Sequence, residues 1–81
     1  MTEQHADCEL DTRGLRCPEP VMMLHRQLRK MQVGEVVALL ATDPATLRDV
    51  PQFCEFLPHR LIASLNQDDD YRFWIEKGER P

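Results

Sequence analysis

The 81-residue chain lacks the features of several common protein classes. No apolar run approaches the roughly 18 residues needed to span a bilayer, and residues 1–5 are polar, without the apolar stretch of a signal peptide. There is no Cys-x-x-Cys pair and no His-x-x-x-His pair, which argues against a structural zinc site. The three cysteines are widely spaced and odd in number, unlike a disulfide framework. We therefore expect a cytoplasmic protein with no membrane segment and no bound metal.

The charge is unevenly distributed along the chain. The net charge of −4 argues against a nucleic-acid-binding surface across the whole molecule. One segment is nevertheless basic, because residues 13–30 hold one acidic residue, Glu19, and five basic residues: Arg13, Arg16, Arg26, Arg29 and Lys30. This segment is either a solvated helix face or a docking surface for an acidic partner. The salt dependence of partner binding would distinguish the two interpretations.

The spacing of apolar residues predicts six elements in the order βαβαββ. Alternation of apolar and polar residues is typical of half-buried strands, and a short, nearly continuous apolar run is typical of a central strand. Apolar residues at helical spacing indicate amphipathic helices. The expected elements are strands at 6–12, 35–41, 60–66 and 71–77, and helices at 18–32 and 50–57.

This order predicts an α+β fold, a two-layer sandwich with two helices on one face of a four-stranded mixed sheet. Strands joined through helical crossovers tend to be parallel, and the last two strands should form a hairpin. The length indicates a single domain, residues 1–81, with a loose N-terminus at residues 1–5. Pro51 interrupts the second helical pattern, so we expect a short turn at 44–48 and a helix that starts with Asp49 as N-cap and Gln52 as its capping partner.

The candidate functional site is the segment Arg16-Cys17-Pro18-Glu19-Pro20. Pro18 and Pro20 suit the first turn of a helix, which places Cys17 at or beside the N-cap. Free backbone N–H groups and the helix dipole favour an anion there. We therefore expect the thiol of Cys17 to be shifted toward the nucleophilic thiolate, with Arg16 supporting its charge.

The other cysteines and the histidines are weaker candidates. Cys8 and Cys54 fall in apolar patterns and are expected to pack in the core, although either could serve as a resolving thiol if it lay near Cys17. His25 lies about two helical turns beyond Cys17, too far for a direct base, and the position of His59 is open. A thiol without a base, a substrate pocket or a metal suits the transfer of a single sulfur atom between partner proteins.

Several motifs of the chain resemble the TusA-type sulfur carrier family, the SirA-like group. The resemblance covers nearly the whole chain and is strongest at the Cys-Pro-x-Pro core. The matching segments are residues 10–23, Asp43-Pro44-Ala45-Thr46, Asp49-Val50-Pro51, Phe53-Cys54, Tyr71-Arg72-Phe73 and Ile75-Glu76-Lys77-Gly78.

The resemblance implies a sulfurtransferase-type carrier without a cofactor. Cys17 would accept persulfide sulfur from a cysteine desulfurase and pass it to a relay complex of the TusBCD kind, for 2-thiolation of tRNA wobble uridine. Related carriers supply molybdenum cofactor synthesis or sulfur oxidation. No stable binding of nucleic acid is expected. The alternatives are a non-catalytic adaptor or regulatory module in which Cys17 is structural, and a thiol redox enzyme, which the missing Cys-x-x-Cys pair weakens.

Overall fold

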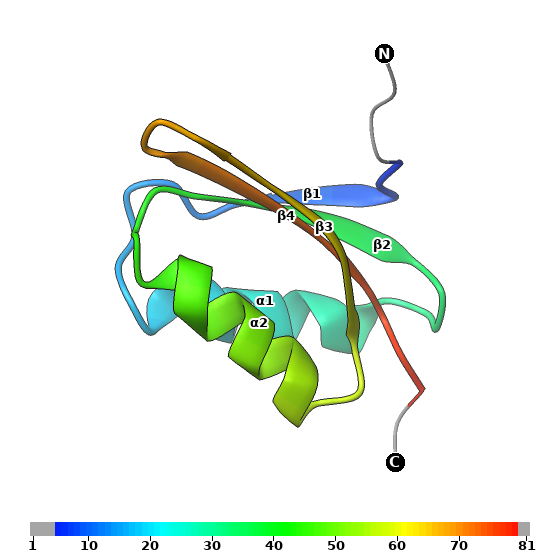
Figure 1. The fold of residues 1–81 in the computed structure, drawn as a ribbon. Coiled ribbons are helices and arrows are strands. Elements are labelled where there is room, and N and C mark those ends of the chain that lie inside the picture. Colours follow the sequence, from blue (N-terminus) through cyan, green and yellow to red (C-terminus); the bar gives the residue numbers. More distant parts are fainter. Residues whose placement is uncertain (1–4, 80–81) are drawn as a thin grey trace.

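The computed structural model describes residues 5–79. Its elements follow one another in the predicted order βαβαββ (Figure 1). They are β1 (Cys8–Asp11), α1 (Glu19–Lys30), β2 (Val36–Ala41), α2 (Thr46–Phe56), β3 (Arg60–Gln67) and β4 (Asp70–Glu76). Most of the expected loose N-terminus, residues 1–4, lies outside the described residues.

The four strands form one mixed sheet in the order β1-β2-β4-β3. β1 pairs with β2 in parallel, as expected for strands joined through a helix, and β3 and β4 form the predicted antiparallel hairpin. β2 lies between β1 and β4, and all six of its residues are buried, which explains its continuous apolar sequence. Both helices cover the same face of the sheet, so the expected two-layer α+β sandwich is confirmed (Figure 1).

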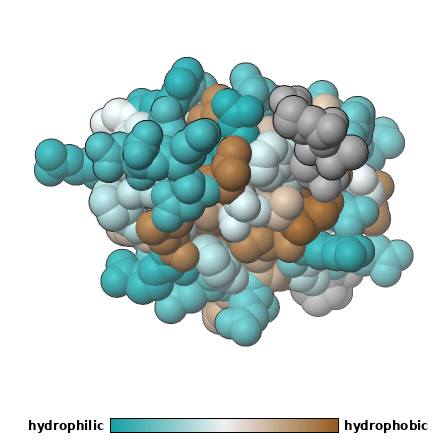
Figure 2. Space-filling view, turned by 45° about the horizontal axis from the view of Figure 1, so that its top comes forward, coloured by the Kyte–Doolittle hydropathy of each residue, from teal (hydrophilic) through white to brown (hydrophobic). Residues whose placement is uncertain are grey.

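The core lies between this sheet face and the helices. In α1, Leu24 and Leu28 are completely buried, four residues apart on one face of the helix. In β4, Phe73 and Ile75 alternate with more exposed residues, as the sequence pattern predicted. Burial of each such large apolar side chain contributes about 1.5–3 kcal/mol to folding. On the side shown in Figure 2, apolar patches lie between hydrophilic side chains.

The expected start of the second helix was wrong. α2 begins at Thr46 and continues through Pro51, so Asp49 lies in its first turn and is not its N-cap. Because proline has no N–H, the helix loses the one hydrogen bond that residue 51 would donate to the carbonyl four residues earlier. Burial of the face formed by Thr46, Val50 and Cys54 offsets that loss. From the first turn of α2, the side chain of Asp49 contacts Cys17.

Candidate functional site around Cys17

Cys17 is exposed on the loop that connects β1 to α1. Pro18 is the N-cap of α1, so Cys17 lies beside the cap, as expected. Its peptide bond to Pro18 is cis. β1 and β2 are parallel, and both helices begin at the end of the molecule where these two strands end (Figure 1). Cys17 therefore lies where the start of α2 can reach it.

The loop before Cys17 is fixed to the end of β2. The backbone N–H and the buried hydroxyl of Thr12 both donate to the carbonyl oxygen of Leu40, at 2.8 and 2.6 Å. The N–H of Gly14 donates to Oγ1 of Thr42 at 2.9 Å. Gly14 has a φ of +86°, a conformation that side-chain-bearing residues rarely adopt. These contacts set the path of the chain toward Cys17.

Asp43 holds the backbone of Cys17 in place. Its Oδ2 accepts a hydrogen bond from the N–H of Cys17 at 2.6 Å, and its Oδ1 accepts one from the N–H of Ala45 at 3.1 Å. The hydrogen bond from Cys17 and that from Ala45 lower the pKa of the Asp43 carboxyl below its usual value. One carboxylate thus joins the start of α1 to the turn before α2.

Asp49 is the partner of the thiol itself. The Sγ of Cys17 donates a hydrogen bond to Oδ2 of Asp49 at 3.0 Å. The other carboxylate oxygen of Asp49 accepts from Nε of Arg48 at 3.1 Å. The hydrogen bond to Asp49 raises the pKa of the Cys17 thiol above its usual value, and the charges of Asp49 and Asp43 add to that effect.

The expected shift of Cys17 toward thiolate is therefore wrong for this arrangement. A thiolate cannot donate a hydrogen bond, and a nearby carboxylate disfavours a second negative charge. These effects of Asp49 and Asp43 oppose the favourable field of the α1 N-terminus. The charge of Arg48 lowers the pKa of Cys17, but it offsets only part of the effect of the two carboxylates. The thiol is accessible, but its resting form is the neutral one.

The remaining residues of the predicted segment surround the thiol unequally. Arg16, Pro18 and Glu19 are exposed, whereas Pro20, in the first turn of α1, is buried. The positive charge of Arg16 helps to lower the pKa of Asp43, so it acts on the carboxylate beside Cys17. The N–H of Glu19 donates to the carbonyl oxygen of Arg16 at 2.8 Å, which closes the turn around Cys17.

The basic residues do not form one continuous surface. Arg26 and Arg29 line a shallow groove on α1, together with Met22 and His25. Lys30 is exposed in the last turn of the same helix. Arg13 lies apart from them, because it pairs with Asp11 at 2.9 Å and lines a different groove over β3 and β4.

The other cysteines have packing roles. Cys54 is 7% exposed in the core, and burial raises the pKa of its thiol to about 11. Cys8 is half-buried, and its Sγ lies 3.4 Å from Nε2 of Gln27 and 3.9 Å from Sδ of Met31. None of the three cysteines is in a disulfide. Core packing is thus confirmed for Cys54, and Cys8 packs against the core cluster.

His25 and His59 pack together against one aromatic ring. The rings of His25 and His59 both lie against Phe53, with centroid separations of 5.6 and 5.8 Å. Nδ1 of His59 also accepts a hydrogen bond from the N–H of Gly78 at 3.1 Å. The hydrogen-bond partner of the Cys17 thiol is an aspartate and not a histidine.

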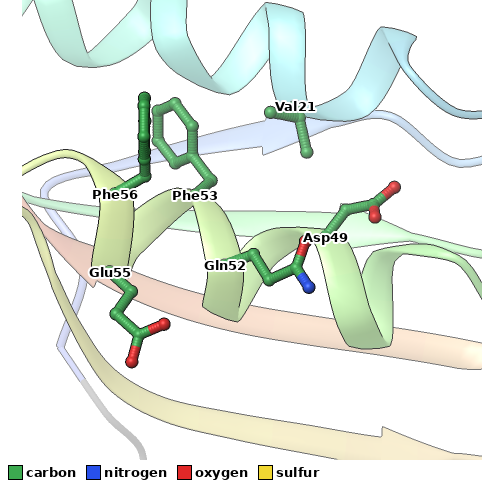
Figure 3. A pocket seen from close by; sticks show the side chains of 6 residues that line it. All are labelled: Val21, Asp49, Gln52, Phe53, Glu55 and Phe56. Carbon is green, nitrogen blue, oxygen red and sulfur yellow. The ribbon is translucent and has the colours of Figure 1, made fainter.

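A groove between α1 and α2 ends at Asp49 (Figure 3). Val21 projects into it from α1, and the side chains from α2 that line it are Asp49, Gln52, Phe53, Glu55 and Phe56. Phe56 is 88% exposed, which is unusual for a large aromatic side chain. The groove is open and shallow, a shape that suits contact with a protein surface.

Sequence reasoning missed Asp43 and Asp49 as site residues. Both follow β2, whose end lies beside the end of β1 because the two strands are parallel. Residues after neighbouring parallel strands meet at one edge of a sheet, and ligand and active sites often form there. That rule would have placed Asp43 near Cys17, whereas the position of Asp49 depends on the start of α2 at Thr46.

Within residues 5–79, no cluster of three potential metal ligands forms, and neither helix has the length and apolar character of a membrane span.

Both the sequence and the fold of the chain are similar to those of known proteins. A family model described as Sulfurtransferase TusA matches residues 8–77. The chain is 48% identical over 77 residues to the sulfur carrier protein TusA of Pseudomonas entomophila, covering 95% of this chain and 96% of that protein. Its fold matches the crystal structure of a SirA-like protein from Desulfitobacterium hafniense with a TM-score of 0.77 and 23% identity, over 89% of this chain and 99% of the other. The chain therefore belongs to the TusA family of sulfur carrier proteins.

Proposed function

We propose that Cys17 is the residue that carries sulfur, as a persulfide. The observation that supports this most is its exposure: Cys17 is exposed, whereas Cys8 is half-buried and Cys54 is buried. The loop of Cys17 is held by hydrogen bonds to Asp43 and to the end of β2, which gives partners a fixed target. A carrier of this kind needs a reachable thiol more than an enclosed pocket.

The proposed transfer has two steps. Sγ of Cys17 attacks the outer sulfur of a donor persulfide, so that one S–S bond forms on Cys17 as the donor's S–S bond breaks and the donor cysteine leaves as a thiol. An acceptor cysteine then attacks the outer sulfur on Cys17 in the same way. Arg16 stabilises the negative charge of the persulfide, and Pro18, Glu19 and Pro20 hold the geometry of the turn.

The proposed partners are a cysteine desulfurase as donor and a TusBCD-like relay complex as acceptor, with 2-thiolation of tRNA wobble uridine as the final use. The exposed side chains of Arg26, Arg29 and Lys30 on α1 form the proposed docking surface, and Arg13 adds a separate basic point. The protein acts in the cytoplasm as a single domain, without a cofactor or a stable complex with nucleic acid.

Intact-mass analysis tests the role of Cys17. The protein is incubated with a cysteine desulfurase and cysteine, and we expect a mass increase of one sulfur atom that disappears in Cys17→Ser. Cys54→Ser is the matched control and should still gain the sulfur. No adduct on the wild type, or an adduct that survives Cys17→Ser, would overturn the proposal. A Cys17→Ser protein that keeps full activity in cells would favour the adaptor alternative.

A second experiment tests the use of the sulfur. A bacterial host that lacks its own carrier receives either the wild type or Cys17→Ser, and 2-thiouridine is measured in its bulk tRNA. We expect the wild type alone to restore the modification. If the wild type becomes persulfidated but leaves tRNA unmodified, the carrier role stands and the tRNA pathway is wrong.

A further inference from the structure

The contact between Cys17 and Asp49 joins two helices across the site. Cys17 precedes α1 and Asp49 lies in the first turn of α2, yet Sγ and Oδ2 are only 3.0 Å apart. Nε of Arg48 donates to the second oxygen of the carboxylate at 3.1 Å, and the Asp49 side chain is only 17% exposed, which limits its freedom to turn away. The thiol is thus aimed at α2 by a restrained acceptor.

We infer that Asp49 is a positioning residue for sulfur uptake, which holds the empty Cys17 as a neutral thiol against α2 and loses this contact when sulfur is loaded. The inference rests on the proposed role of Cys17 as the sulfur carrier. It assigns a function to a carboxylate that the transfer chemistry itself does not require.

The chemistry of loading explains why the contact is lost. The empty thiol donates its hydrogen to Asp49, whereas Sγ of a persulfide is bonded to a second sulfur and has no hydrogen to donate. The reaction is balanced, since a thiol and a donor persulfide give a persulfide on Cys17 and a donor thiol, and no oxidant is needed. A persulfide is a stronger acid than a thiol, so the outer sulfur becomes anionic more readily.

Charge then separates the loaded sulfur from α2. The charged groups that act on the Cys17 thiol are the carboxylates of Asp43 and Asp49 and the guanidinium of Arg48, and Arg16 acts on the carboxylate of Asp43. Asp49 would lie within a few ångströms of the new anion, and like charges at that range repel. The exposed persulfide therefore turns outward, where an acceptor cysteine can reach it. The empty and the loaded carrier differ in the direction of the sulfur.

The same contact limits unwanted reactions of the empty carrier. Thiolate is the reactive form of cysteine, and the contact with Asp49 reduces its population. The raised pKa of Cys17 is in accord with this role of Asp49. A donor protein that displaces or neutralises Asp49 on docking would release the thiol for attack, whereas a small electrophile would not.

Alkylation of the empty thiol by iodoacetamide tests this inference. The rate at Cys17 is followed by peptide mass mapping across a range of pH for the wild type and Asp49→Asn. We expect the rate profile of Asp49→Asn to move to lower pH. If the profile moves by one pH unit, the thiolate population and the alkylation rate at neutral pH rise by roughly tenfold. An unchanged profile, or one that moves to higher pH, overturns the inference.

Two further variants separate a specific effect from a general one. Arg48→Gln removes the positive charge that partly offsets Asp49, so alkylation should slow and the profile should move to higher pH. Glu55→Gln removes a carboxylate from the same groove without contacting the thiol and should leave the profile unchanged. Equal acceleration by Glu55→Gln and Asp49→Asn would show a general charge effect and overturn the assignment.

Alkylation of the empty carrier is independent of sulfur transfer. It uses a small reagent, so it needs neither a donor nor an acceptor. If Cys17 gains no sulfur from a desulfurase while Asp49→Asn moves the profile, the carrier proposal fails and the control of the thiol stands. If Cys17 is loaded normally and the profile does not move, Cys17 remains the carrier residue and the role of Asp49 is wrong.

Discussion

The ammonium group of Lys77 donates a hydrogen bond to the carbonyl oxygen of Met31 at 2.7 Å. Lys77 follows β4 and is only 9% exposed, and Met31 is the C-cap of α1. Cations are favourable at helix C-termini, where carbonyl groups lack intrahelical partners. This contact joins the end of α1 to the end of β4, at the opposite end of α1 from Cys17.

Lys77→Met should destabilise the fold without changing the site. The methionine keeps the apolar stem but leaves the carbonyl of Met31 without its charged donor, and such hydrogen bonds contribute about 1.5–3 kcal/mol. We expect a lower free energy of unfolding in urea denaturation. Lys30→Met, on the exposed side of the last turn of α1, is the matched control. Equal stability of the two variants would contradict the role of Lys77.

Gly78→Ala should also destabilise the protein, by a steric effect. A Cβ at residue 78 would lie 1.5 Å from the carbonyl oxygen of Pro58, so the backbone after α2 or after β4 must move. Forced rearrangements of packed structure cost about 1–3 kcal/mol. The comparison is Glu79→Ala, an exposed position one residue away. A thermal midpoint as high as that of Glu79→Ala would show that this close approach is absent in solution.

Asp43→Asn should weaken the fold in a pH-dependent way. The pKa of Asp43 is lowered by the N–H groups of Cys17 and Ala45, so its contribution to stability is present above the unfolded pKa of 3.8 and is lost as the pH falls through the lower folded pKa. Asparagine would place its own NH₂ group against one of these donors.

Urea denaturation at neutral pH and at about pH 3 measures this effect. The wild type should be more stable than Asp43→Asn at neutral pH, and the difference should shrink in acid. Asp69→Asn, in the exposed turn between β3 and β4, is the control. A constant difference between wild type and Asp43→Asn at both pH values would exclude a role for the ionised carboxylate.

Arg26→Glu should weaken binding of a cysteine desulfurase if the basic side chains of α1 form the docking surface. Reversal of an exposed charge lowers mainly the association rate. We expect about a tenfold loss of affinity at low salt, which is the lower end of the range for electrostatic effects on association. The loss should diminish at high salt. Arg72→Glu, on β4 in the other layer of the molecule, should bind as the wild type does. Equal losses for the two variants would exclude a specific surface on α1.

The sequence pattern predicted the fold because the apolar pattern of each strand agrees with its burial in the sheet. β2 is apolar throughout and lies inside the sheet, and the alternation of Tyr71, Phe73 and Ile75 matches their burial in β4. The order of strands in the sheet was not predicted, because periodicity says which face of a strand is buried and nothing about its neighbour. β4 inserts between β2 and β3, which no local pattern specifies.

The errors near the site arose from tertiary contacts. Pro51 indicated a helix over residues 50–57 with Asp49 as its N-cap, but the packed face of α2 tolerates a proline in its second turn. That error placed Asp49 at a cap and hid its contact with Cys17. The expectation of a thiolate considered the helix that follows Cys17 and omitted the helix that lies across from it. A pKa depends on all charges within reach, including those distant in sequence.

The two carboxylates that hold Cys17 lie 26 and 32 residues after it in the chain. A nascent chain that has left the ribosome only as far as β2 would therefore expose Cys17 with neither Asp43 nor Asp49 in place. Its thiol would react as in a short peptide until α2 emerges and docks. Detachment of α2 from the folded protein would free the thiol in the same way. The reactivity of Cys17 therefore indicates whether α2 is docked.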